Sequence, residues 1–157
     1  MATRQSRFGV GPKIALPTLA YAALAGAATR MSPRICLLFS GISGAVLIAG
    51  VLLILAGVAL LIAAATAVTR AYRDGRLITS GVFALCRHPI YAAWIVLIVP
   101  GLMLLTRSWP LLLTPLLAYA VFKVLIHEED DYLSRQFGTA YDDYRARVNE
   151  LVPFPRH

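Results

Sequence analysis

The sequence predicts an all-α integral membrane protein: a bundle of about four transmembrane helices with a short amphipathic segment at its C-terminal, cytoplasmic end. Of the 157 residues, 59% are hydrophobic, and the mean hydropathy is +0.70. This apolar share is well above that of an ordinary soluble domain. The apolar residues also form long uninterrupted blocks, and one helical crossing needs about 20 of them. We therefore expect a single membrane-embedded domain over residues 1–157.

The net charge of +7 does not by itself indicate a nucleic-acid partner. Lys and Arg stand between apolar blocks and form no basic stripe with interleaved aromatic residues. Cys36 and Cys86 lack the spacing of metal ligands. The acidic residues at 130–131 and 142–143 are not spaced like a calcium loop, and we interpret them as a solvated face. We expect no nucleic acid and no metal, and membrane lipids as partners. The sequence does not indicate an oligomeric state.

The first part of the chain should be a basic arm, residues 1–13, followed by two accessory spans over 14–68. Apolar residues 14–29 form the first span, and MSPR at 31–34 forms a tight turn. The uncharged run 35–68 is too long for one upright helix and too short for two helices and a turn.

We expect one long helix over 35–68 that is tilted or kinked around residues 41–44. Its glycines suit close helix packing in lipid; these are Gly44, Gly50 and Gly57.

Residues 69–157 should carry the cofactor-binding and catalytic region, beginning with a polar loop at 69–87. The third span is expected over 88–106, with a kink at Pro100-Gly101. A turn at 107–110 leads into the rest of the chain.

The fourth span, residues 111–126, should continue as one helix through the polar sequence HEEDDYLSRQF. Gly138 is expected to end that helix. A short amphipathic helix and a proline-rich tail follow.

The distribution of basic residues predicts that both termini and the polar site face the cytoplasm of an inner or plasma membrane. All eight acidic residues fall on that side. On the outer side are Arg30, Arg34 and Arg107. On the inner side are Arg4, Arg7, Lys13, Arg70, Arg73, Arg76, Arg87, Lys123, Arg135, Arg145, Arg147 and Arg156.

Arg87, His88 and Pro89 stand at the mouth of the third span. Proline suits the first helical position, because its missing N–H would have no partner there. The following free N–H groups form a site for an anion, and the Arg87 guanidinium suits a carboxylate or phosphate. The alternative is that Arg87 only anchors the topology and His88 only caps the helix.

The turn at 107–110 brings spans three and four together as a hairpin. Residues whose numbers sum to about 217 then lie at equal depth, so His88 should face Glu129. Ionisable residues at such depth usually mark function, and a small zwitterion would fit between the two charged groups. A simple ion pair of Arg87 with Glu128 or Glu129 remains the alternative.

Two segments, LITSGVFALCRHPIY and HEEDDYLSRQFGTAYDDYRARVNELVPF, resemble the isoprenylcysteine carboxyl methyltransferase and phospholipid N-methyltransferase superfamily. The resemblance covers about residues 44–154, although Leu133 departs by one place from the family spacing. The residues that match are Thr79, Gly81, Phe83, Arg87, His88, Pro89, Tyr91, Glu128, Glu129, Phe137, Gly138, Tyr141, Tyr144 and Pro153.

The resemblance implies a membrane methyltransferase that uses S-adenosylmethionine and a lipophilic acceptor. It implies that Arg76, Leu77 and Ile78 contact the adenosine and that Phe83 packs on the base. His88, Pro89, Ile90 and Tyr91 would line the methionine end, and Glu129 would bind the ammonium or the ribose. The expected catalytic residues are Arg87, His88, Glu128 and Glu129. For Tyr132, Tyr141 and Tyr144, anchoring at the membrane interface is the preferred interpretation.

Two other functions stay open: a sterol-reductase-like oxidoreductase with a related RHP motif, and a non-enzymatic membrane scaffold. The acceptor is a separate question. Relatives that methylate prenylcysteine carboxylates look as if they place an arginine where this chain has Leu125. A leucine cannot compensate a buried carboxylate. We therefore expect a neutral, amine or thiol acceptor, with His127 or Glu128 as the base, unless Lys123 reaches the site.

Overall fold

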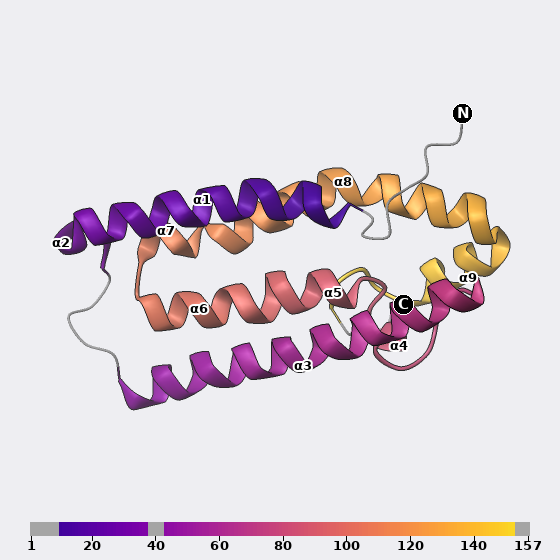
Figure 1. Ribbon diagram of the computed structural model, residues 1–157, viewed down its shortest axis with the longest axis horizontal. Coiled ribbons are helices and arrows are strands. Elements are labelled where there is room, and N and C mark those ends of the chain that lie inside the picture. Colours follow the sequence, from indigo (N-terminus) through magenta and orange to yellow (C-terminus); the bar gives the residue numbers. More distant parts are fainter. Residues whose placement is uncertain (1–9, 38–42, 153–157) are drawn as a thin grey trace.

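The computed structural model describes residues 10–37 and 43–152 as a bundle of long, roughly parallel rods (Figure 1). Helix α1 lies along α8, and α3 lies along the rod made by α5, η1 and α6. The elements are α1 (Gly11–Met31), α2 (Pro33–Cys36), α3 (Gly44–Asp74), α4 (Val82–Leu85), α5 (Pro89–Ala92), η1 (Ala93–Ile98), α6 (Val99–Thr106), α7 (Trp109–Leu112), α8 (Thr114–Phe137) and α9 (Thr139–Arg147).

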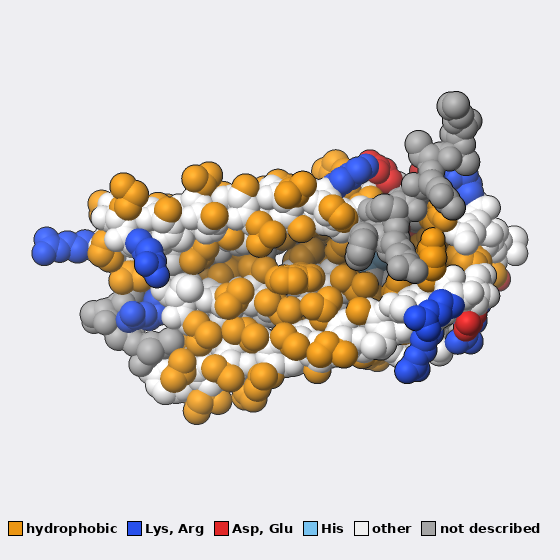
Figure 2. Space-filling view, viewed as in Figure 1, with side chains coloured by type: hydrophobic (Ala, Val, Ile, Leu, Met, Phe, Trp, Pro, Cys, Tyr) orange, Lys and Arg blue, Asp and Glu red, His pale blue; other side chains and the backbone are white. Residues whose placement is uncertain are grey.

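The predicted all-α membrane bundle is confirmed, and three helical stretches are long and apolar enough to cross a membrane. They are Gly44–Asp74, Pro89–Thr106 and Trp109–Phe137. Helix α1 has 21 residues but includes Pro17 and charged residues near both ends, so it does not join them. The fourth crossing therefore stays a prediction. Hydrophobic side chains cover the middle of the molecule, and Lys and Arg gather at its two ends (Figure 2).

The expectation of one helix over residues 35–68 is wrong at both ends. Pro33–Cys36 forms a separate turn of helix, and Leu37 is extended. Helix α3 begins only at Gly44, where the Ser43 side chain accepts the Val46 N–H. It then continues six residues beyond 68, because no helix breaker stands before Gly75, which adopts the left-handed conformation with φ 61°.

The polar loop therefore begins at Gly75 rather than at residue 69. Residues 1–9, most of the predicted arm, and Gly41 of the predicted kink lie outside the described residues.

The third rod begins at Pro89, as expected, but its middle is π-helical over Ala93–Ile98. Pro100 follows this stretch. A proline has no N–H for the preceding turn and its ring crowds that turn, so a widened turn accommodates it. The departure from regular α-helix that was expected at Pro100-Gly101 thus lies just before these residues, in the π-helical stretch. Gly138 ends α8 with φ 57°, as predicted.

Glycines allow α3 to pack closely against the third rod. A Cβ atom at Gly57 would lie 2.6 Å from Ile98, and one at Gly50 would lie 2.8 Å from Leu105. Gly101 contacts the same interface from the other side. The expectation for Gly44 is wrong, because a Cβ atom there meets nothing within 4 Å.

Gly101→Ala should destabilise the bundle. Its Cβ would lie 2.8 Å from the backbone oxygen of Gly50, which cannot rotate away. Such overpacking costs about 1–3 kcal/mol. Gly26→Ala, also in a helix, meets nothing within 4 Å and is the matched control. Thermal unfolding in detergent should show a lower midpoint for Gly101→Ala alone; equal midpoints would contradict the close α3–α6 contact.

Candidate functional site

A buried polar cluster lies at the end of the bundle that carries α4 and α9 (Figure 1). Its core is almost fully covered: Arg87 is 3% exposed, His88 4% and Asp130 1%. We call these three residues, with Glu129, Tyr141 and Glu150, the polar cluster. They come from the loop before α5, from α8, from α9 and from the segment after α9.

The Arg87 guanidinium is the centre of the cluster. Its Nη1 donates to both carboxylate oxygens of Asp130 at 3.0 Å and to the Tyr141 hydroxyl at 3.3 Å. Its Nη2 lies 3.5 Å from Glu150. Burial disfavours the charged form of Arg87, but Asp130 and Tyr141 outweigh this effect and raise its pKa above the ordinary value. Arg87 is therefore a permanent buried cation.

His88 and Glu129 face each other across the hairpin, as the numbering sum of 217 predicts. His88 Nδ1 lies 3.8 Å from Glu129, and His88 Nε2 lies 3.3 Å from Asp130. The Tyr91 hydroxyl donates to Glu129 at 2.9 Å, and the Val10 N–H donates to it at 3.4 Å. Glu129 is thus a carboxylate with fixed neighbours and a partly exposed side chain.

The alternative ion pair of Arg87 with Glu128 or Glu129 is wrong, because Arg87 binds Asp130 instead. The buried residues of α8 recur every four positions: Thr114, Ala118, Phe122, Ile126 and Asp130. Asp130 therefore continues the inner face of the helix and does not belong to a solvated face. That spacing was the signal in the sequence that could have identified it.

Helix α9 contributes two tyrosines, which are buried rather than placed at the membrane interface. Tyr141 donates to Asp130, and the Tyr144 hydroxyl donates to the Phe83 carbonyl at 2.6 Å. Burial raises the pKa of both side chains, so both are protonated donors at neutral pH. Their spacing of three residues places them on one face of α9. Tyr132 is only partly buried.

The C-terminal segment, residues 148–152, closes the cluster. The Arg87 N–H donates to the Asn149 carbonyl at 2.8 Å, and the His88 N–H donates to the Glu150 carbonyl at 3.0 Å. Leu151 joins the hydrophobic core. Lys123 of α8 donates to the Glu150 carboxylate at 2.8 Å.

The other residues implied by the resemblance are less closely joined to the cluster. Pro89 and Phe83 are buried, whereas Leu77, Ile78 and Ile90 are partly buried. Arg76 is exposed and pairs with Asp74 at 3.1 Å. Glu128 is exposed and pairs with Lys13 of α1.

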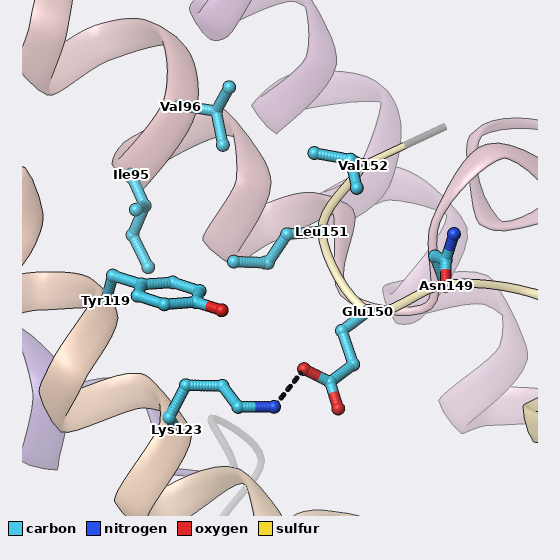
Figure 3. A pocket seen from close by; sticks show the side chains of 8 residues that line it. All are labelled: Ile95, Val96, Tyr119, Lys123, Asn149, Glu150, Leu151 and Val152. Carbon is cyan, nitrogen blue, oxygen red and sulfur yellow. Dashed lines mark hydrogen bonds and ion pairs between the residues drawn. The ribbon is translucent and has the colours of Figure 1, made fainter. Parts of the chain in front are cut away.

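A pocket of about 300 Å³ lies beside the cluster, between η1, α8 and the C-terminal segment (Figure 3). It is lined by Ile95, Val96, Tyr119, Lys123, Asn149, Glu150, Leu151 and Val152.

Leu125 is not part of this lining and packs against the hydrophobic core. The pocket-lining face of α8 carries Tyr119 and Lys123. His127 and Glu128, the expected bases, are exposed and lie outside the lining.

Asp130→Asn should strongly destabilise the protein, because it leaves the buried Arg87 cation without its main counter-charge. Removing one partner of a buried ion pair costs about 3–5 kcal/mol. The neighbouring Asp131→Asn removes the same charge from an exposed side chain and should be close to neutral. Thermal unfolding in detergent measures both, and similar midpoints would show that Asp130 does not stabilise the fold.

The fold and the cluster define a helical membrane protein with a polar site at one end of its bundle. The chain belongs to the isoprenylcysteine carboxyl methyltransferase (ICMT) family, which matches residues 42–135. Helices α1 and α9 and Glu150 lie outside the matched residues.

Two similar proteins are named protein-S-isoprenylcysteine O-methyltransferase. The one from Schizosaccharomyces pombe is 33% identical over 81 residues, 52% of this chain and 34% of that protein. The one from Mus musculus is 35% identical over 78 residues, 50% of this chain and 28% of that protein.

A third similar protein is the nickel-cobalt-cadmium resistance protein NccN of Alcaligenes xylosoxydans xylosoxydans. It is 39% identical over 87 residues, 52% of this chain and 40% of that protein. The chain thus spans well under half the length of these relatives. No solved structure matches it.

Proposed function

We propose that this chain is an integral membrane methyltransferase that uses S-adenosylmethionine and acts on a lipophilic, membrane-partitioned acceptor. The observation that carries the proposal is the meeting of His88 and Glu129 beside the buried Arg87, in a family of methyltransferases. The family match does not favour the sterol-reductase-like or scaffold alternatives. The related proteins named as O-methyltransferases support an enzyme.

The residues present fit the methionine end of S-adenosylmethionine, which carries an ammonium, a carboxylate and a sulfonium. Glu129 offers a partly exposed carboxylate for the ammonium. The start of the rod at Pro89 offers N–H groups for the carboxylate. Among the described residues, Arg87 Nε is a buried nitrogen without a hydrogen-bond partner, whereas His88 Nε2 faces Asp130 at 3.3 Å. The Arg87 guanidinium therefore retains an N–H that could donate to a ligand.

The bound cofactor would supply a methyl group already activated by the sulfonium. In our proposal Glu129 and His88 hold the methionine end, and Tyr91 holds Glu129 in place. Phe122 packs against both His88 and Tyr91, with ring centres 5.8 and 5.4 Å apart, and excludes water. To transfer a methyl group from a sulfonium, an enzyme mainly has to position the donor and the acceptor and exclude water. Arg76, Leu77, Ile78 and Phe83 are proposed for the adenosine end.

The cofactor proposal predicts that the purified protein binds S-adenosylmethionine and its demethylated product. Glu129→Gln and His88→Ala should each weaken binding by about tenfold or more, because each removes a charge-assisted contact. Calorimetry in detergent measures the affinity.

The control for this test is Glu128→Gln, which removes the adjacent but exposed carboxylate and should bind like the unaltered protein. Unchanged affinity in folded Glu129→Gln would remove the proposed site. Binding of NADPH in place of S-adenosylmethionine would favour the oxidoreductase.

We also propose four crossings with both termini and the polar cluster on the cytoplasmic side, on the basis of the distribution of Lys and Arg. Ser32 and Ala140 are exposed at opposite ends of the bundle, whereas Ser108 is fully buried and unsuitable for labelling.

Ser32→Cys should react with an impermeant maleimide from outside intact cells, and Ala140→Cys should react only after permeabilisation. Cys86 gives little background, since burial raises the pKa of its thiol to about 11. Cys36 is buried and is replaced by alanine in both variants. Labelling of position 140 from outside would overturn the orientation.

A further inference from the structure

The side chains proposed for the methionine end of the cofactor are covered by other parts of the chain. His88, Pro89 and Tyr91 are all buried. Glu129 has a side chain that is 21% exposed, but one of its oxygens already accepts hydrogen bonds from the Tyr91 hydroxyl and the Val10 N–H. A ligand as large as an amino acid therefore reaches these groups only if a neighbouring segment moves away.

Two segments outside the hairpin cover the site, and they are held with different strength. The C-terminal segment is joined to residues 87–88 by backbone hydrogen bonds of 2.8 and 3.0 Å. The start of α1 reaches the site through a longer hydrogen bond, from the Val10 N–H to Glu129 at 3.4 Å. It is also held by the ion pair of Lys13 with Glu128, but both side chains are at least half exposed, and such a pair contributes little. The start of α1 is therefore the segment that is released more easily.

The start of α1 closes the site with two aliphatic side chains. Val10 is 1% exposed and Ile14 is 6% exposed, and both belong to the same core cluster as Tyr91. A Cβ atom at Gly11 would lie 3.9 Å from the Tyr91 hydroxyl oxygen. Residues 10–16 thus cover the polar groups behind Tyr91 and keep water away from them.

Pro17 separates residues 10–16 from the rest of α1. It has no N–H to donate to the Lys13 carbonyl one turn earlier, and its ring crowds that turn. The Thr18 hydroxyl donates to the Ile14 carbonyl at 2.7 Å, a type of bond that also bends helices. The Pro17 side chain is exposed, so it does not fasten the helix to the core. This position is therefore a hinge at which the start of α1 can turn.

We propose that residues 10–16 form a lid over the polar cluster, which pivots at Pro17 and is latched by the ion pair of Lys13 with Glu128. Opening exposes Glu129 to solvent, and closure shields it again. As the gate for S-adenosylmethionine, the lid rests on the proposed function. The lid lies outside the residues that match the family, so it is built from a part of this chain that the match does not describe.

The rate at which a buried thiol reacts with a water-soluble maleimide measures lid opening in the whole protein in detergent, without any cofactor. The reporter is Val10→Cys, made together with Cys36→Ala. The reference is Ile126→Cys on α8, which replaces a fully buried residue of the same core cluster and reports unfolding of the bundle. Val10→Cys should react about tenfold faster or more, because the lid opens without the rest of the fold. Equal rates would overturn the lid.

Two further substitutions, each added to Val10→Cys, test the hinge and the latch. Pro17→Ala supplies the missing N–H and should slow labelling by about threefold or more. Leu16→Ala, at the adjacent exposed position, adds no backbone hydrogen bond and should leave the rate unchanged. Lys13→Met removes the latch and should speed labelling by about two- to fivefold. Lys13→Arg should retain the original rate.

Unchanged labelling in Pro17→Ala, or labelling in Lys13→Met that is no faster, would overturn the proposal. Saturating S-adenosylmethionine should slow the labelling of Val10→Cys, since the lid closes over the bound cofactor. Binding in calorimetry without any slowing would overturn the gate. Absence of binding would instead remove the proposed function, while the labelling without cofactor still decides the lid.

Discussion

The buried contact between Arg87 and Asp130 constrains the rest of the structure. A guanidinium this far from water must be paired and hydrogen-bonded, or the fold loses several kcal/mol. Its partner sits on the innermost face of α8, so the contact fixes the depth of the third rod relative to the fourth. Tyr141 binds Asp130 and draws α9 onto the bundle, and Glu150 draws the C-terminal segment to Arg87. One charge thus organises four separate parts of the chain.

Features set by local chemistry were predictable from the sequence. Pro89 begins the third rod and Gly138 ends α8, because each residue type has a strong preference for that position. The approach of His88 to Glu129 followed from the length of two hairpin arms around a short turn. No knowledge of side-chain packing was needed for these predictions.

The rotation of α8 about its own axis and the long-range contacts were not predictable in the same way. A helix with the sequence HEEDD offers four neighbouring acidic groups, and only the four-residue spacing of buried positions selects Asp130. The same rotation places Lys123 in the pocket and Leu125 against the core. The backbone pairing of residues 149–150 with 87–88 leaves no periodic pattern in the sequence.

That backbone pairing has a consequence for the order in which the protein is made. The N–H groups of Arg87 and His88 find their acceptors only in Asn149 and Glu150, more than sixty residues later in the chain. All the apolar helices are therefore synthesised before the partners of these two amides. Until then water or another protein must satisfy the two N–H groups at the start of the third rod. Completion of the site is thus a late step in the synthesis of the protein.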